Sequence, residues 1–340
     1  MPSLLLARGA QRLGWRNDEI PLDALSPRRI PGWSGPSEHD AHVPSPALAA
    51  GARLRTGVRI DRLELANGRV TAATGTAATE AGPVTVRIRC RDVFVCGGAI
   101  QTPALLQRSG VRRNVGRSLA IHPTVKLAAR FAEAINVPDD VPVHQVKEFA
   151  PGLSFGGSAS NPGLVALALS DGWRDFSAAV EQWQNIAVYY AAITSEGRGR
   201  VVSVPGMRDP LVTYRLTAQD RALLGSGLGR LAHTMLAAGA EEVYPSFRGA
   251  PPVRTAADLA AMNQAFAVSR ASVMTVHLCS TVPMGERTDR CGADSFGRVH
   301  GYDNLRVNDA SLLPDAPGVN PQGSIMAIAI RNIRRFLEER

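Results

Sequence analysis

Two short segments in the last third of the chain contain the side chains best suited to chemistry. The first contains His277, followed by the small residues Cys279, Ser280 and Thr281, and the second contains Asn320 just before a predicted helix. A histidine titrates near neutrality and can take a proton, whereas a carboxamide beside a helix N-terminus can stabilise negative charge. The pair predicts an active site that removes a proton and holds an oxyanion. Taken singly, each residue also fits a structural role, as a packed histidine or as part of a turn.

The composition is that of a globular protein with two lobes. The chain has 340 residues, of which 45% are hydrophobic and 20% are charged, and it has no long polar tract. A chain of this length usually forms about two domains. The net charge of +8 comes from scattered arginines, since Lys126 and Lys147 are the two lysines, and aromatic residues make up 5%. Because the basic residues form no dense run and aromatic residues are few, the sequence does not favour a nucleic-acid partner despite its positive net charge.

The cysteines and the N-terminus bear on the cellular compartment. Cys90, Cys96, Cys279 and Cys291 show no Cys-x-x-Cys spacing, so we predict neither a metal site nor a disulfide framework. The first residues lack the positive charge and the long apolar run of a signal peptide. No segment approaches the roughly 18 apolar residues that a membrane span needs. We therefore expect a cytoplasmic protein without a membrane span.

The elements before residue 123 predict an α/β domain. An apolar run at 92–96 is typical of a buried parallel strand, and it ends at Gly97-Gly98-Ala99. A strand that runs into small residues and then a helix is where an α/β sheet presents backbone amides to a ligand. The predicted elements, in chain order, are helix 3–13, an irregular connection over 16–46, helix 45–50, strands 52–63, 69–73, 85–89 and 92–96, and helix 103–108.

The middle of the chain predicts a second lobe built on an antiparallel sheet. Short alternating strands separated by turn residues are typical of such a sheet, and we expect this lobe to bind the substrate. The predicted elements are strands 125–131, 164–169, 186–193, 200–204 and 211–215 and helices 218–238 and 255–267. The chain then returns to the first lobe and closes with a helix over 323–337. The expected domains are 1–123 with 271–340, and 124–270. The fold class is α/β, with α+β character in the second lobe.

Four segments together resemble the glucose-methanol-choline (GMC) flavin oxidoreductases. Residues 96–110 resemble the second signature of that family, and residues 114–123 resemble the segment that follows it. Residues 277–285 resemble the pattern His-x-x-Gly-Thr-x-x-Met-Gly, with Ser280 in place of the glycine. Asn320-Pro321 is similar to the Asn-Pro of the family. The resemblance implies an FAD-binding domain and an antiparallel-sheet substrate domain.

The resemblance also implies a reaction, which is the oxidation of a small-molecule alcohol by hydride transfer to N5 of FAD. His277 would act as the base, and Asn320 would donate a hydrogen bond to the alkoxide oxygen, which is worth about 3 kcal/mol for one such donor. The helix N-terminus after Asn320 would stabilise the reduced flavin. The residues implied in cofactor contacts are Val58, Gly98, Ala99, Thr102, Asn114, Gly116, His122, Asp309, Ala310, Pro321 and Gln322.

The sequence has no counterpart of the segment that binds the FAD pyrophosphate in this family. That segment is a strand, Gly-x-Gly-x-x-Gly and a helix, whose backbone amides meet the pyrophosphate. The explanations are a lost upstream stretch, which we favour, a second chain that supplies the segment, or a non-catalytic remnant. In each case we expect exposed apolar surface and poor FAD binding by the chain alone.

Two further motifs are similar to known site patterns. Residues 225–229, Gly-Ser-Gly-Leu-Gly, resemble a dinucleotide loop, but no strand precedes them, and we expect a helix with glycines. Residues 152–156 match Gly-x-Ser-x-Gly, so a serine esterase that uses Ser154 is a further alternative. The helix that should follow a nucleophile elbow is missing, because glycine, serine and proline come next.

Overall fold

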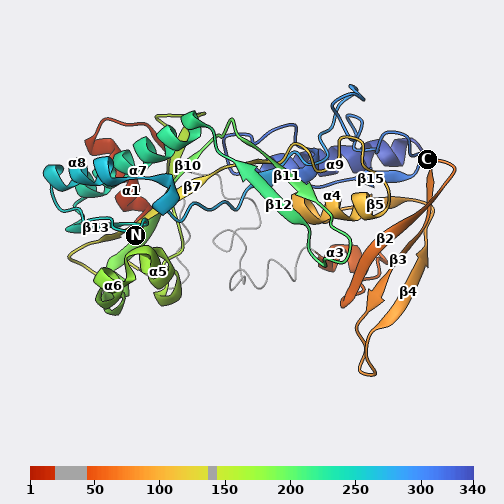
Figure 1. Cartoon of the computed structure of the whole chain (residues 1–340), viewed down its shortest axis with the longest axis horizontal. Helices are drawn as coiled ribbons and strands as arrows, with labels where there is room; N and C mark the ends of the chain where they lie inside the picture. Colours follow the sequence, from red (N-terminus) through yellow and green to blue (C-terminus); the bar gives the residue numbers. More distant parts are fainter. Residues whose placement is uncertain (20–43, 137–143) are drawn as a thin grey trace. The chain divides into compact units, whose positions relative to one another are not determined.

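A computed structural model of the chain describes residues 1–19, 44–136 and 144–340 (Figure 1). The chain forms two compact units, and each unit is assembled from three segments. Unit 1 contains Met1–Arg55, Pro123–Ile193 and Arg221–Met274, and unit 2 contains Thr56–His122, Thr194–Asp220 and Thr275–Arg340. Most of the irregular connection predicted at 16–46 lies outside the described residues.

Unit 1 is built on an antiparallel sheet of six strands in the order β1-β8-β9-β10-β7-β13, which confirms the predicted antiparallel lobe. Helices α1, α7 and α8 are drawn beside this sheet in Figure 1. The strands are β1 (Asn17–Glu19), β7 (Thr124–Arg130), β8 (His144–Val146), β9 (Leu153–Gly157), β10 (Ile186–Ile193) and β13 (Glu242–Pro245). The helices are α1 (Pro2–Arg12), α3 (Pro44–Ala49), α5 (Pro162–Leu169), α6 (Trp173–Phe176), α7 (Ala218–Ala238) and α8 (Ala256–Ala265), with 3-10 turns η1 (Ser170–Gly172), η2 (Ser177–Asn185) and η3 (Val268–Arg270).

Helix α1 belongs to unit 1, although we expected residues 1–123 to lie in one domain with the C-terminal segment. The hydroxyl of Tyr189 in β10 donates to the backbone oxygen of Pro2 across 2.8 Å. The backbone N–H of His144 in β8 donates to the hydroxyl of Ser3 across 2.7 Å. Leu6 of the same helix is fully buried. These partners are more than 140 residues away in sequence, so local patterning gives no sign of them.

Segment 164–169, predicted as a strand, lies within helix α5 (Pro162–Leu169), and the prediction is wrong. Asn161 caps this helix, because its side-chain oxygen accepts from the backbone N–H of Leu164 across 2.9 Å, and Pro162 occupies the first turn. The segment Pro-Gly-Leu-Val-Ala-Leu-Ala-Leu is apolar almost throughout, so its periodicity does not separate strand from helix. The capping signal was the better guide.

The two decoy motifs are ordinary secondary structure. Residues 225–229 lie inside α7, as predicted, and a Cβ on Gly229 would come within 2.4 Å of the side chain of Asn263 in α8. The glycine therefore allows the two helices to pack closely. Ser154 lies within strand β9 and pairs with Ala192 of β10. A nucleophile elbow places its serine in a sharp turn between a strand and a helix, and Ser154 has no such position.

Unit 2 combines small sheets with two helices that lead toward the candidate site. Its strands are β2 (Val58–Ala66), β3 (Arg69–Ala77), β4 (Val84–Arg89), β5 (Val93–Val95), β6 (Ala120–Ile121), β11 (Arg198–Val202), β12 (Leu211–Arg215), β14 (Leu278–Cys279) and β15 (Leu305–Val307). Its helices are α4 (Gly98–Arg108), the 3-10 turn η4 (Ala310–Leu312) and α9 (Gln322–Glu338). Strands β5 and β15 run parallel, as the apolar run at 92–96 predicted, and β2, β3 and β4 form an antiparallel sheet.

The core of unit 2 explains why residues 194–220 join it. The side chain of Gln107 in α4 donates to the backbone oxygen of Val201 across 2.8 Å and accepts from the N–H of Ser203 across 2.8 Å. The hairpin of β11 and β12 is thereby tied to α4, whereas we expected it in the substrate lobe. Leu106 of the same helix is fully buried in a cluster with Leu305 and other residues of β15.

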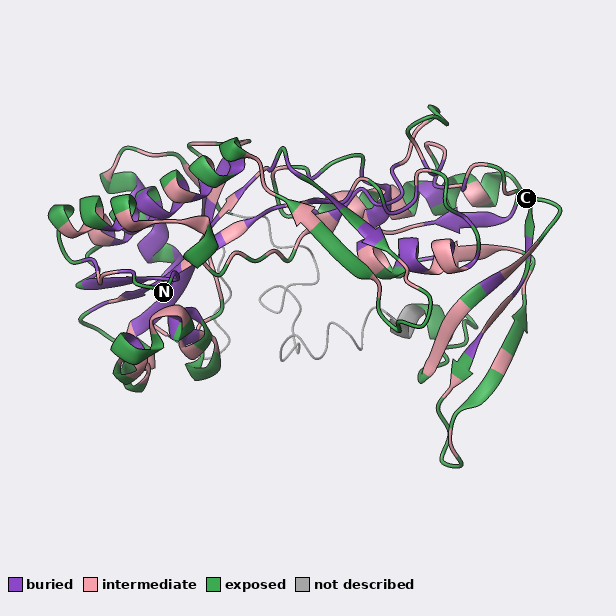
Figure 2. Cartoon of the chain, in the orientation of Figure 1, coloured by how far each residue is buried: buried purple, intermediate pink, exposed green. Residues whose placement is uncertain are grey.

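Helix α9 leaves one apolar face exposed (Figure 2). Met326, Ile330, Ile333 and Leu337 are 41%, 52%, 38% and 62% exposed. Their spacing of four, three and four residues places them on one side of the helix. On another side, Ile328 packs against the core of unit 2. We call these four exposed side chains the α9 stripe.

Candidate active site

The junction between β5 and α4 is held by one carboxylate. Asp309, which follows β15, accepts from the backbone N–H of Gly98 across 2.8 Å and from the hydroxyl of Thr102 across 2.5 Å. Its other oxygen accepts from the N–H of Ser311 across 2.8 Å. Gly98 and Thr102 lie in the first turn and a half of α4, the helix that follows β5. Asp309 therefore links the end of β15 to the start of the helix that follows its parallel neighbour β5. The sequence analysis predicted that Gly98, Thr102 and Asp309 contact the cofactor, and the structure shows that they contact one another.

We expect Asp309→Ala to destabilise unit 2 by about 3 kcal/mol, because two backbone N–H groups and one hydroxyl lose a charged acceptor. Urea unfolding followed by circular dichroism measures the change. The matched control is Asp303→Ala, since Asp303 is exposed and its ion pair with Arg69 spans 3.5 Å. That control should cost under about 1 kcal/mol. Equal unfolding midpoints for the two variants would rule out the linking role of Asp309.

His122 and His277 form a contacting pair because two very short strands run side by side. Strands β6 and β14 are antiparallel, and Ile121 pairs with Leu278. His122 directly follows β6 and His277 directly precedes β14, so the two rings meet. Their Nδ1 atoms lie 3.1 Å apart, and the rings are nearly perpendicular at 89° with centroids 5.2 Å apart. The sequence assigned these residues to one site but did not predict their contact.

The two histidines differ in exposure and in partners. His122 is 4% exposed, and its Nε2 accepts a hydrogen bond from the backbone N–H of Gly318 across 3.0 Å. His277 is partly buried, and desolvation by burial lowers its pKa below the ordinary value. A histidine with a lowered pKa is neutral at pH 7 and can take up a proton during a reaction. His277 therefore has the neutral charge that a general base requires.

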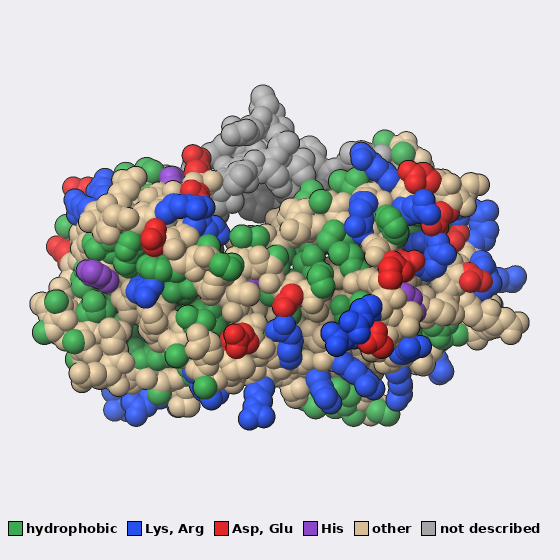
Figure 3. Space-filling view, turned by 90° about the horizontal axis from the view of Figure 1, so that it is seen from above, with side chains coloured by type: hydrophobic (Ala, Val, Ile, Leu, Met, Phe, Trp, Pro, Cys, Tyr) green, Lys and Arg blue, Asp and Glu red, His purple; other side chains and the backbone are tan. Residues whose placement is uncertain are grey.

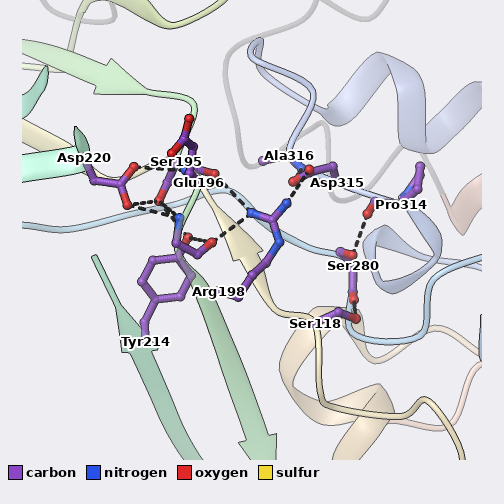
Figure 4. Close-up of polar contacts among 11 residues, drawn as sticks. Ser118, Ser195, Glu196, Arg198, Tyr214, Asp220, Ser280, Pro314, Asp315 and Ala316 are labelled. Atoms are coloured by element: carbon purple, nitrogen blue, oxygen red, sulfur yellow. Dashed lines mark hydrogen bonds and ion pairs between the residues drawn. The ribbon is translucent and has the colours of Figure 1, made fainter. Parts of the chain in front are cut away.

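The loop from residue 314 to residue 320, which we call the Asn320 loop, is anchored at its start (Figure 4). The hydroxyl of Ser280 donates to the backbone oxygen of Pro314 across 2.8 Å, and Arg198 of β11 forms an ion pair with Asp315 at 2.6 Å. The hydroxyl of Ser118 donates to the backbone oxygen of Ser280. Asn320 lies exposed at the other end of the loop, two residues after Gly318. Sequence reasoning missed Arg198 and Asp315, because a single ion pair across 117 residues has no local signature.

Ser280 shows why a glycine is usual at its position. Its φ is +67°, in the left-handed region that glycine adopts without strain. The chain keeps this backbone with a serine, whose hydroxyl then bonds Pro314. The departure from the family pattern therefore adds an anchor for the Asn320 loop.

Three of the predicted cofactor residues make contacts within the protein in this structure. The side-chain nitrogen of Asn114 donates to the backbone oxygens of Thr288 and Cys291, both across 3.0 Å. A Cβ on Gly116 would come within 2.3 Å of the backbone oxygen of Val201, so this glycine allows close packing. Val58 begins β2, opposite Ala77.

The remaining predicted contacts lie at helix starts. Ala99 is buried in the first turn of α4, and Ala310 begins η4. Pro321 is buried directly before α9, and Gln322 is its exposed first residue. Their contacts with a cofactor stay predictions.

The cysteines offer no reactive thiol at the site. All four are free. Burial raises the pKa of Cys279, two residues after His277, to about 11, and it raises the pKa of Cys96 to about 11 as well. Such thiols stay protonated at neutral pH and are poor nucleophiles. Across residues 1–19, 44–136 and 144–340, no group of histidine, cysteine, aspartate and glutamate side chains could hold a metal ion.

Comparison with protein-family models gives two matches, both described as GMC oxidoreductase, at residues 36–124 and 194–329. An uncharacterized GMC-type oxidoreductase from Sinorhizobium fredii is 36% identical over 340 residues, which are 97% of this chain and 67% of that protein. The chain belongs to the GMC oxidoreductase family. FAD is the cofactor of this family, as the sequence predicted.

The match to more distant relatives covers a smaller part of those proteins. A long-chain-alcohol oxidase from Arabidopsis thaliana is 27% identical, over 77% of this chain and 39% of that protein. The crystal structure of pyridoxine 4-oxidase from Mesorbium loti matches with a TM-score of 0.60 at 21% identity, over 83% of this chain and 57% of that one. The α/β fold class is thereby confirmed. The chain spans between about two fifths and two thirds of the length of these relatives.

The residues present fit one end of FAD. Gly98 has a φ of +74° at the start of α4, and a Cβ built on it would meet nothing within 4 Å. Gly323 in the first turn of α9 is equally open. Both helix starts therefore leave room for a group to approach the backbone at these glycines. The positive end of the α9 dipole suits the anionic edge of a reduced flavin.

The surface charges and the helices bear on two classes of partner, nucleic acids and membranes. On the face drawn in Figure 3, arginine and lysine side chains are interspersed with aspartate and glutamate, which does not favour a nucleic-acid surface. Of the helices in the described part of the chain, none is long and apolar enough to cross a membrane.

Proposed function

We propose that this chain supplies the catalytic half of an FAD-dependent alcohol oxidoreductase. The observation that carries the proposal is the pairing of a neutral, partly buried His277 with His122, beside the loop that ends at Asn320. Family membership and an alcohol oxidase among the relatives support the same reaction class. The substrate is a small molecule with a primary or secondary hydroxyl group.

The roles of the residues follow from their chemistry. His277 takes the hydroxyl proton of the alcohol, and Asn320 donates a hydrogen bond to the oxygen that is left negatively charged. Gly98, Ala99, Thr102, Asp309, Ala310, Pro321 and Gln322 are the residues that would hold the flavin end of FAD. When bound, FAD supplies the hydride acceptor. Asp309 contributes indirectly, because it fixes the start of α4 through Gly98 and Thr102.

We expect alcohol-dependent reduction of the flavin to show a rate that rises with pH. Burial lowers the pKa of His277 below its usual value of about 6.5, so the neutral base forms as pH rises through that lowered pKa. Above it the rate should stay level. Anaerobic stopped-flow bleaching of the FAD-loaded protein, mixed with a series of alcohols between about pH 4.5 and 8, measures this profile.

Two results would contradict the proposal. One is the absence of bleaching with every alcohol tested. The other is a His277→Gln variant that keeps the same dependence of the rate on pH, since the titrating group would then be another residue.

A second candidate function is that of a subunit or fragment that binds FAD only with a partner segment. The α9 stripe favours it, because four large apolar side chains on one helix face are the kind of surface that other protein chains cover. The parallel pair of β5 and β15 points the same way, since parallel strands normally lie within larger buried sheets. This candidate is compatible with the first, because the partner segment would supply the amides that bind the pyrophosphate.

A further inference from the structure

The backbone N–H of Gly318 determines where the protons of the histidine pair lie. It donates to Nε2 of His122, so this nitrogen uses its lone pair and carries no hydrogen. A neutral imidazole has one N–H, which places the hydrogen of His122 on Nδ1. That Nδ1 faces the Nδ1 of His277 at 3.1 Å, so His277 accepts there and carries its own hydrogen on Nε2.

This arrangement makes His277 a hydrogen-bond donor and prevents it from acting as a base. Its Nε2 already holds a hydrogen. Adding a proton to its Nδ1 would place two N–H groups against each other at 3.1 Å, where His122 already donates. A histidine that takes a proton on Nε2 must first carry its hydrogen on Nδ1, and His122 must then accept instead of donate.

We propose that Gly318 controls the base through His122, and that His277 becomes a base only when the Gly318 N–H leaves His122. This inference rests on the proposed function of His277 and adds a positioning role for His122. On release, the Nδ1 hydrogen of His122 passes to Nδ1 of His277, Nε2 of His277 loses its hydrogen to water, and Nε2 of His122 takes one from water. No net proton is gained or lost. His277 can then take the alcohol proton on Nε2, and the resulting cation donates from Nδ1 to His122.

The Asn320 loop is built so that such a release can occur at one end. Its start is fixed by Ser280 and by the ion pair of Arg198 with Asp315. Gly318 follows three residues later with a φ of +69°, and Val319 after it is 45% exposed. The same segment carries Asn320, so a movement that frees His122 also moves the predicted oxyanion donor. Proton acceptance and the placement of that donor are therefore coupled.

The test is a measurement of the ring tautomers in the chain itself, without FAD or substrate. Histidine labelled with ¹⁵N gives two-dimensional spectra in which an unprotonated ring nitrogen resonates far downfield of a protonated one. The chain has seven histidines, and the signals of His277 and His122 are identified by their loss in single glutamine variants. At pH 7.5 we expect hydrogen on Nε2 of His277 and on Nδ1 of His122. Hydrogen on Nδ1 of His277 in the unsubstituted chain would overturn the proposal.

His122→Asn tests the control by Gly318. The asparagine amide can reach the position of Nδ1 but offers no Nε2 to the Gly318 N–H, so Gly318 no longer forces a donor toward His277 and the amide oxygen can accept from Nδ1 of His277. We expect the Nδ1 signal of His277 to shift upfield as this nitrogen gains hydrogen. His300→Gln is the matched control, because His300 lies in the same unit and contacts the backbone oxygen of Gly285 instead. An unchanged His277 tautomer in His122→Asn would show that Gly318 does not control it.

These results are independent of the proposed function. The tautomers are measured without catalysis, so the relay can be confirmed in a chain that oxidises no alcohol. Conversely, an active enzyme with the opposite tautomers would keep the function and exclude the relay.

Discussion

Replacing His277 with alanine should lower the rate of flavin reduction by an alcohol by about 10²- to 10⁴-fold, the usual contribution of a positioned general base. The physical reason is that the variant lacks the partly buried, neutral imidazole that is proposed to take the hydroxyl proton. The rate is measured by anaerobic stopped-flow bleaching on an FAD-loaded form of the protein. Such a form is a chimera that joins this chain to the unmatched third of the Sinorhizobium relative.

Two further variants make the result specific. His300→Gln should stay within about twofold of the parent, because the ring of His300 contacts the backbone oxygen of Gly285 and belongs to neither the histidine pair nor the Asn320 loop. Asn320→Ala should lose about 10²- to 10³-fold if it donates to the oxyanion. A His277→Ala protein that is reduced at the parent rate would exclude His277 as the base.

The second large effect concerns FAD binding itself. We expect the 340-residue chain to purify nearly colourless, and the chimera to carry close to one flavin per chain. The reason is that the chain's glycine-rich helix starts fit the flavin end, whereas the pyrophosphate requires the backbone amides of a Gly-x-Gly-x-x-Gly helix. The absorbance of flavin near its visible maximum, relative to the protein absorbance, measures occupancy.

The α9 stripe provides the control for that experiment. In the chimera, Ile330→Glu combined with Ile333→Glu should abolish the gain of flavin, because charges would prevent the partner segment from covering the helix. Leu167→Glu on α5 of unit 1 alters a side chain that is 62% exposed and should leave flavin occupancy unchanged. A yellow, stoichiometric flavoprotein from the chain alone would refute the need for a partner segment.

Patterns within a few residues predicted much of the secondary structure. Helix α7 begins and ends where the sequence indicated, at Ala218 and Ala238. Strand β5 was also found from its short apolar run. Helix α4 begins at Gly98, five residues before the start that was predicted for helix 103–108. The family and the fold class followed from motifs around those elements.

Contacts between segments that are far apart in the chain could not be predicted from the sequence. Strands β6 and β14, which bring His122 to His277, have two residues each, too few for any periodicity. The placement of α1 in unit 1 depends on partners such as Tyr189, more than 180 residues away. The hydrogen bond from Gly318 to His122 is equally distant, and it comes from a backbone group that every non-proline residue possesses.

The serine at position 280 also has a consequence for the unfolded chain. A serine explores fewer backbone conformations than a glycine, so less entropy is lost when the segment folds. The left-handed backbone at this position opposes that gain, and the hydroxyl bond to Pro314 offsets the strain. An alanine at position 280 would keep the backbone strain and lose the hydrogen bond to Pro314. The residues that leave this segment ordered are therefore glycine, which has no strain here, and residues whose side chain can bond Pro314. Few substitutions should therefore be tolerated at position 280, although the hydroxyl of Ser280 bonds Pro314 rather than either histidine.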